Sequence, residues 1–297
     1  MSCSTTQAYA LIRPVPLMPG FAARIDGLDL GRPLTPGAKA ELHRALLEFE
    51  LLLFEPQELA PERHIDLASA FGAIASGAYF PRKDGHPEIE IITFDETHPP
   101  ELNVWHSDVT WKSPPPTGTV IQVVELPAEG GNTCWSSGSK AFAALSEGMK
   151  AYLRGLTATH SWQGSIVQDA LEAAGEEAVV SAVRRFKAVV HPVVRRHPES
   201  GKEVLFVNET FTRRIDCVPF RESRAMLEFL REWMIQPEFV YAHRWEPNGI
   251  AVWDNRSTQH YAVADYWPAR RTVQRVTFQS DADVREAEAR RGESDER

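Results

Sequence analysis

Apolar residues along this chain follow two periods, one typical of helices and one typical of buried strands. The segment AKAELHRALLEF, residues 38–49, places its apolar residues three and four positions apart, which predicts an amphipathic helix. The next run, LLLF at residues 51–54, is short and wholly apolar, as expected of a buried strand. Residues 61–71 begin with Pro and are followed by Gly72, so we predict a second helix there.

The rest of the chain is dominated by short strand patterns that are broken at Gly and Pro turns. We predict strands at residues 89–94, 118–126, 188–194, 204–207, 239–245, 250–253 and 272–279. We predict further helices at residues 139–154, 167–187 and 222–234. Many short strands with helices packed outside indicate a mainly β fold with flanking helices (α+β), arranged as a barrel or a double-sheet jelly roll.

A single domain accounts for residues 1–281, with a helical insert at about residues 160–187. The sequence EAAGEEA at residues 172–178 interrupts the helical pattern of this insert. Residues 282–297 are charged and almost free of apolar side chains, so we expect a frayed helix or a disordered tail there.

Charge and cysteine content narrow the classes of partner. The 297 residues carry a formal net charge of -9, which disfavours nucleic acid and anionic membranes as partners. Cys3, Cys134 and Cys217 are far apart and form no C-x-x-C pair, which argues against disulfides or a cysteine zinc site and fits a reducing compartment. No signal-peptide pattern or membrane-spanning apolar run is present. We therefore expect a cytoplasmic protein that acts on a small molecule, and leave open whether it forms a homodimer or a tetramer.

Candidate metal ligands occur in VWHSDVTW, residues 104–111, where His106 and Asp108 are two apart. In a strand this spacing puts both side chains on one face, as two of the three ligands of a facial triad. The pattern alone is weak, because composition gives roughly half an occurrence by chance. His64 and Asp66 repeat it within a helical pattern, where residues two apart diverge, so we interpret that pair as helix surface.

The third ligand is expected to be His260, because of the residues around it. It lies in WDNRSTQHYAVADY, residues 253–266, which is followed by a strand pattern containing Arg271 and Arg275. Residues four apart on a strand point the same way, so two guanidinium groups would face one pocket and could each bind an acid group. The alternative is a pair of surface arginines on an exposed strand.

Several motifs in order resemble the taurine dioxygenase family of iron(II)/2-oxoglutarate oxygenases, which includes chlorophenoxyacetate and alkylsulfate oxygenases. The resemblance covers about residues 24–278 and is strongest in WHSDVT, LPAEGGNTCW, HPVVRRHPESGKEVLFVNETFTRRI and WDNRSTQHYAVADYWPARRTVQRVTF. It implies a double-stranded β-helix, a cupin-like jelly roll. It also implies a dioxygenase that uses iron(II), 2-oxoglutarate and O2, hydroxylates a C–H of a small anionic substrate and releases succinate and CO2.

The resemblance also implies roles for single residues. His106, Asp108 and His260 match the iron ligands of the family. Arg271 matches the arginine that binds the far carboxylate of 2-oxoglutarate, and Thr133 in GGNTCW matches the hydroxyl residue that assists it.

Substrate positions are implied in the same way. Arg275 matches the arginine that holds the acid group of the primary substrate, and Phe211 and Ser165 match pocket positions. The sequence departs from taurine-specific members in FGAIASGAYF, residues 71–80, where Gly77 and Phe80 replace a His and a Tyr. Ile166 replaces an apolar ring that is expected near Ser165. The site for an acid group is therefore retained, while contacts specific for taurine are missing.

Two other classes of protein remain open at this stage. A jelly-roll metal protein such as a hydrolase or an isomerase would use only the metal triad. A non-catalytic binding module would need none of the pocket residues. Oxygen-dependent succinate formation separates the oxygenase from both, and the primary substrate is left as a sulfonate, an alkyl sulfate, an aryloxy acid or another acid.

Overall fold

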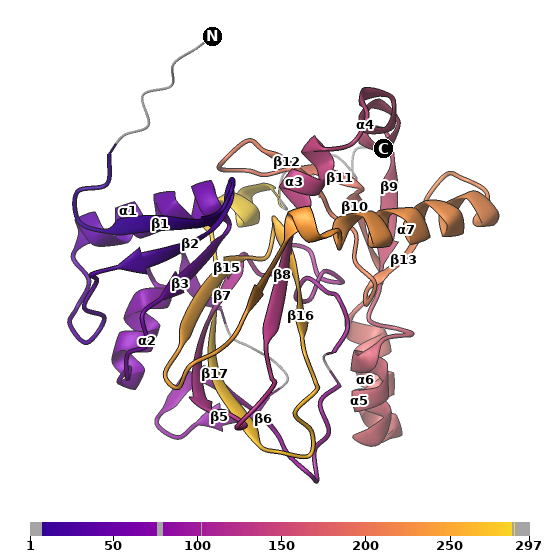
Figure 1. Ribbon diagram of the computed structural model, residues 1–297. Coiled ribbons are helices and arrows are strands. Elements are labelled where there is room, and N and C mark those ends of the chain that lie inside the picture. Colours follow the sequence, from indigo (N-terminus) through magenta and orange to yellow (C-terminus); the bar gives the residue numbers. More distant parts are fainter. Residues whose placement is uncertain (1–7, 76–79, 102, 287, 289–297) are drawn as a thin grey trace.

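A large mixed sheet forms the frame of the protein in a computed structural model that describes residues 8–75, 80–101, 103–286 and 288 (Figure 1). Its strands run in the order β1-β2-β3-β15-β7-β17-β6-β5, with β4 paired to β17. Every pairing in this sheet is antiparallel except that of β2 with β3. The strands are β1 (Arg13–Met18), β2 (Phe21–Asp26), β3 (Leu51–Phe54), β4 (Ala73–Ala75), β5 (Arg82–Lys83), β6 (His86–Phe94), β7 (Gly118–Glu125), β15 (Ile250–Asp254) and β17 (Arg271–Gln279).

Smaller sheets and seven α-helices complete the described part of the chain. The sheets are β14-β8-β16, β10-β9-β13 and β11-β12, formed by β8 (Thr133–Ser137), β9 (Thr157–His160), β10 (Val189–Pro192), β11 (Val194–Arg196), β12 (Glu203–Leu205), β13 (Thr212–Ile215), β14 (Val240–His243) and β16 (Thr258–Ala262). The helices are α1 (Pro36–Phe49), α2 (Pro61–Ala68), α3 (Gly138–Ala143), α4 (Glu147–Arg154), α5 (Ile166–Ala173), α6 (Glu176–Arg185) and α7 (Phe220–Met234), with a 3-10 turn at Pro237–Phe239.

The apolar residues of the main sheet alternate between two cores. On β3, Leu52 and Phe54 pack with α1 and α2, which lie along one side of the sheet in Figure 1. Leu51 and Leu53 point the other way and pack with Trp135 of the β14-β8-β16 sheet. Two sheets packed face to face with helices outside form a jelly roll with helical additions, so the expected fold class is confirmed.

Most predicted elements are present, although two of the predicted helices are each divided into two. The helix predicted at residues 139–154 is two helices, α3 and α4, because the chain turns at Ser146, whose hydroxyl caps α4. The helix predicted at 167–187 is also two, α5 and α6, and Gly175 separates them with a φ of 104°. Both lie within the residues expected to form a helical insert.

The ordered chain extends past residue 281, where the charged tail was expected to begin. Asp283 is fully buried and accepts hydrogen bonds from Arg195 (2.9 Å) and Thr117. Arg256 also lies near it, 3.3 Å away, and makes a bidentate pair with Asp254. Asp283, at the start of the predicted tail, therefore completes a buried network of ion pairs next to the turn between β15 and β16.

The second His-x-Asp pair is not on the helix surface, so that interpretation was wrong for His64. His64 is 1% exposed, and its Nε2 donates to the carbonyl of Val120 (3.2 Å), because α2 lies against β7. Asp66 points elsewhere and pairs with Lys39 at 2.6 Å. The two side chains diverge as helical spacing requires and do not share a site.

Burial of His64 makes stability depend on pH. Burial lowers the pKa of His64 to about 4, although its hydrogen bond to Val120 acts in the opposite direction. The unfolded chain takes up a proton below about pH 6.5, whereas the folded protein does not until about pH 4. We therefore expect the free energy of unfolding to fall by about 3 kcal/mol from this group as the pH drops through that window.

Denaturant unfolding of the wild type and His64→Gln between pH 7 and pH 4 measures this contribution. Gln can donate to Val120 but takes up no proton, so the variant should lose that part of the pH dependence. His98→Gln, at an exposed position, is the matched control. Equal pH slopes in the wild type and His64→Gln would contradict the assignment.

Candidate metal centre

His106, Asp108 and His260 lie together in the structure. One ligand atom from each residue falls within 4.8 Å of the others, and no other such group of three occurs among the described residues. His260 is on β16, and His106 faces it through a single β-bridge. The His106 amide donates to the His260 carbonyl (3.0 Å), and the His260 amide donates back (2.7 Å). Two residues 154 positions apart (260 − 106) are thus fixed side by side.

The strand geometry assumed for His106 and Asp108 is not found, because within residues 104–111 only His106 makes a β-bridge. Asp108 lies in a turn that is followed by Val109 with a φ of 54°. The Asp108 backbone is held by Asn255, whose Oδ1 accepts from its amide (2.6 Å) and whose Nδ2 donates to its carbonyl (2.9 Å). A side-chain clamp, and not strand geometry, therefore aims this carboxylate at the two histidines.

The protonation states suit a divalent cation. Burial lowers the pKa of His260 to about 3, with repulsion from His106 adding to the effect, so its ring is neutral at neutral pH. Burial favours the neutral acid at Asp108, but His260 and Arg275 outweigh it and hold the pKa of this carboxyl below its usual range. His106 Nδ1 lies 2.8 Å from the Val104 carbonyl, which leaves Nε2 free to act as a ligand.

Two buried atoms in this cluster lack partners within the part of the chain that the structure describes. They are Asp108 Oδ2 and His260 Nδ1. Buried polar atoms without partners are rare, and a bound ion is one explanation for them. Two imidazoles and one carboxylate form the donor set of a facial triad, which binds iron(II) and leaves open positions. The residues present therefore fit such an ion.

Arg271 is buried against Gly131 in the GGN turn that precedes Thr133. Its Nε is buried and has no hydrogen-bond partner among the described residues. Gly131 has a φ of 69°, and a Cβ there would come within 3.2 Å of the Arg271 side chain, so glycine leaves room for this arginine. The Thr133 hydroxyl accepts from the indole of Trp245 (2.9 Å), which leaves its own proton free to be donated. This cation and hydroxyl suit a carboxylate.

Arg275 and Arg271 are four residues apart on β17, so their side chains point to the same face of the sheet. It is not a free cation. Its Nε and Nη2 donate to Oε2 of Glu90 (2.9 and 2.6 Å), which is the residue opposite Arg275 on β6. Its Nη1 lies 3.8 Å from Asp108 Oδ1, and its guanidinium lies 5.1 Å from the centre of the Phe80 ring. Phe80, Arg275 and the metal ligands therefore border one space.

The other substrate positions are less closely tied to this space. Phe211 is buried with Trp111 and Trp162 beneath α6. The Ser165 hydroxyl donates to the Trp162 carbonyl and receives the Val167 amide (3.3 Å), as at the start of a helix. The backbone of Ile166 begins α5, while its side chain and Gly77 lie outside the described residues.

Three residues that shape the site were missed from the sequence. Glu90 is seen as the partner of Arg275 only once the β6–β17 register is known. Trp245 reaches Thr133 from a loop 112 residues away. Asn255 could have been identified from the sequence, because it lies in the WDNR segment that precedes His260 and supports its assignment.

Comparisons with known proteins agree with this geometry. The family model described as "Taurine catabolism dioxygenase TauD, TfdA family" matches residues 13–277. The chain is 32% identical to an alkylsulfatase of Acinetobacter baylyi, over 87% of this chain and 82% of the relative. It is 29% identical to an α-ketoglutarate-dependent 2,4-dichlorophenoxyacetate dioxygenase of Cupriavidus pinatubonensis, over 91% and 98%. A taurine dioxygenase structure from Burkholderia xenovorans superposes with a TM-score of 0.77 at 32% identity, covering 92% of each chain.

The clamp on Asp108 can be tested through metal affinity. Asn255→Ala leaves a buried amide and carbonyl without partners, so the Asp108 carboxylate should lose its orientation. We expect iron(II) or cobalt(II), titrated calorimetrically into the metal-free protein, to bind about tenfold more weakly.

Asn255→Asp retains the acceptor and loses the donor, so it should give a smaller loss of affinity. Asn103→Ala, at an exposed position, serves as the control. A lower melting temperature with unchanged metal affinity would show that Asn255 supports only the fold.

Proposed function

The chain belongs to the taurine catabolism dioxygenase TauD, TfdA family, and we propose that it hydroxylates a C–H bond of a small anionic substrate in a reaction dependent on iron(II), 2-oxoglutarate and O2. The observation that carries the proposal is the convergence of His106, Asp108 and His260, with the unpartnered buried atoms Asp108 Oδ2 and His260 Nδ1, next to Arg275 of β17, the strand that also carries the buried Arg271. The co-substrate is converted to succinate and CO2.

Each residue has one task in this proposal. His106, Asp108 and His260 would hold iron(II), which when bound supplies the activation of O2. Arg271 would pair with the distal carboxylate of 2-oxoglutarate, and the Thr133 hydroxyl would donate to the same group. Trp245 orients Thr133 by occupying its acceptor. The protein thus supplies position and charge, and the metal and co-substrate supply the oxidation.

The primary substrate is proposed to be an acid that reaches Arg275: a sulfonate, an alkyl sulfate, an aryloxy acid or a related anion. Relatives of this chain are named for three different acids, so family membership alone selects none of them. Phe80 puts an apolar ring against the Arg275 guanidinium where taurine-specific members have a polar side chain. We therefore favour a substrate with an apolar body over taurine.

Other classes of function fit less well. A hydrolase or isomerase on this fold would have no use for a buried arginine beside a paired hydroxyl. A silent binding module would not need a complete triad. Membership of a family of dioxygenases also supports catalysis.

We further propose that the enzyme works in the cytoplasm. Cys134 and Cys217 are unpaired, as expected in a reducing compartment. No helix in the described ranges is long and apolar enough to cross a membrane. The oligomeric state is left to measurement.

The reaction class is tested by succinate release from purified enzyme given iron(II), 2-oxoglutarate and O2, with a panel of sulfonates, alkyl sulfates and aryloxy acids. At least one acid should raise the rate of succinate release. His106→Ala and Asp108→Ala should abolish it, because each removes a metal ligand. Full activity in either variant, or succinate release without O2, would refute the proposal.

Substrate binding by Arg275 is tested by comparing coupled and uncoupled turnover. Arg275→Gln should lower substrate-dependent succinate release at least about tenfold, because a hydrogen bond to a charged group is lost. Decarboxylation of 2-oxoglutarate without substrate should change far less.

The double variant Glu90→Gln, Arg275→Gln serves as the matched control, since it leaves no unpaired buried carboxylate. Equal losses in both reactions, with Glu90→Gln in place, would contradict a role in substrate binding.

A further inference from the structure

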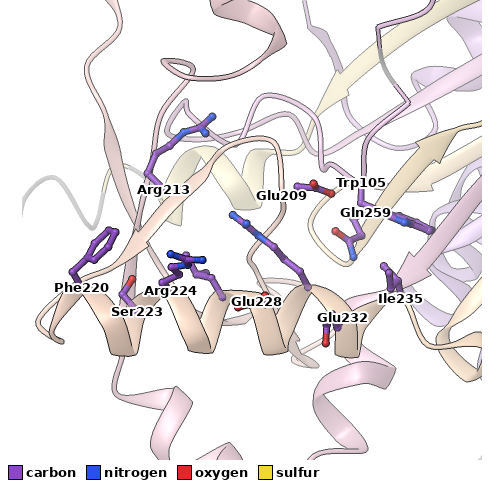
Figure 2. Close-up of a pocket in the computed structure, with 12 residues that line it drawn as sticks. Trp105, Glu209, Arg213, Phe220, Ser223, Arg224, Glu228, Glu232, Ile235 and Gln259 are labelled. Carbon is purple, nitrogen blue, oxygen red and sulfur yellow. The ribbon is translucent and has the colours of Figure 1, made fainter.

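A second pocket lies on the far side of β16 from the metal centre. It has a volume of about 530 Å³ and lies between α7 and the chain around Glu209 and Gln259. Figure 2 shows α7 as one wall, with Phe220 near one end and Ile235 near the other. Arg213, Glu209 and Gln259 face the helix from the opposite side (Figure 2).

Two arginines in this pocket are not paired with an acid. Arg213 and Arg231 are both half-buried, and no carboxylate lies within 4.0 Å of either guanidinium in the described residues. Arg213 donates to the carbonyls of Gly164 (2.8 Å) and Ser161 (3.2 Å). Arg231 donates one bond, to the Thr212 carbonyl (3.0 Å). Two like charges are thus held close together by backbone carbonyls alone.

Unused donors remain at the same place. Arg231 Nε is buried without a partner in the described part of the chain. Gln259 is 2% exposed and lines the pocket, and its amide makes no hydrogen bond with any described residue. Buried polar groups are normally satisfied, so donors left open in a cavity indicate a missing ligand.

The charges favour an anion inside the pocket. Glu209, Glu228 and Glu232 also line it, but all three are exposed, where water and salt screen them. The arginines lie deeper: burial lowers the pKa of both Arg213 and Arg231, and repulsion from Arg231 lowers that of Arg213 further. The exposed Arg224 also lines the pocket, so three arginines face three glutamates, and Glu209 raises the pKa of Arg231 against the effect of burial. The two charged groups that are half-buried are nevertheless both positive.

We propose that this pocket binds a small oxyanion, a carboxylate, sulfate or phosphate group, through Arg231, Arg213 and Gln259. The site is separate from the metal centre and does not depend on the proposed reaction. Trp105 and Gln259 line it and directly precede His106 and His260 in the chain. An anion bound here would lie against the bridge that joins the two histidine ligands.

Calorimetric titration of the full-length protein with sodium sulfate, phosphate and succinate, at low ionic strength, tests the site. At least one anion should bind the wild type, and Arg231→Gln should weaken it at least about tenfold, since a charged hydrogen-bond donor is lost. Preference for succinate would identify a carboxylate site, and preference for sulfate or phosphate a tetrahedral-oxyanion site.

Matched variants separate this pocket from the metal centre. Gln259→Glu keeps the shape of the side chain and adds a negative charge, so it should also abolish binding even if Arg231→Gln folds poorly. Arg221→Gln, on α7 but outside the pocket, should bind as the wild type does. Arg271→Gln should keep the sulfate or phosphate binding of the wild type, whereas succinate binding that it loses belongs to the metal centre. The site is refuted if none of the three anions binds the wild type, if Arg231→Gln and Gln259→Glu bind normally, or if the only binding seen is of succinate and is lost with Arg271→Gln.

Discussion

Two backbone hydrogen bonds between His106 and His260 are the contact on which the proposed metal centre depends. They join a loop to strand β16 and bring the two imidazoles to a centroid distance of 4.1 Å. Asn255, at the turn that leads into β16, then fixes Asp108 through its backbone. The buried ion pair of Asp254 and Arg256 stabilises the same turn. The three ligands are therefore placed by one turn and one bridge, not by a long regular strand.

Charge balance is the second constraint on the interior. Arg275 is partly buried between Glu90 and Asp108, at 2.6 and 3.8 Å, so its charge is largely compensated before any substrate binds. A buried arginine without such a partner would be costly. Arg271 has no carboxylate partner within the described residues, and only the phenol of Tyr266 offsets the effect of burial on its pKa. The two arginines thus differ in how much they gain from an incoming acid, although they share one face of β17.

Hydrophobic periodicity identified the elements that bury apolar faces and missed β8 and β16, which carry Thr133 and His260. Strand β3 and helix α1 were predicted well, because their apolar residues face the cores on either side of the sheet. Strands β8 and β16, TCWSS and TQHYA, carry polar residues on buried faces, so they have no clear alternation. His64 was misplaced for a related reason: a buried histidine satisfied by one carbonyl looks like a surface residue in the sequence.

The sequence alone determined the family resemblance and the β-rich class, and it gave the proposed triad, because motif order and side-chain chemistry are local properties of the chain. The tertiary structure decided how those residues meet. Asn255 holds Asp108 across 147 positions (255 − 108), and Glu90 pairs with Arg275 across 185 (275 − 90). Such contacts depend on sheet register and on the packing of distant segments. No local pattern encodes them, because the energy of a buried charge or amide depends on partners that only the folded chain brings within reach.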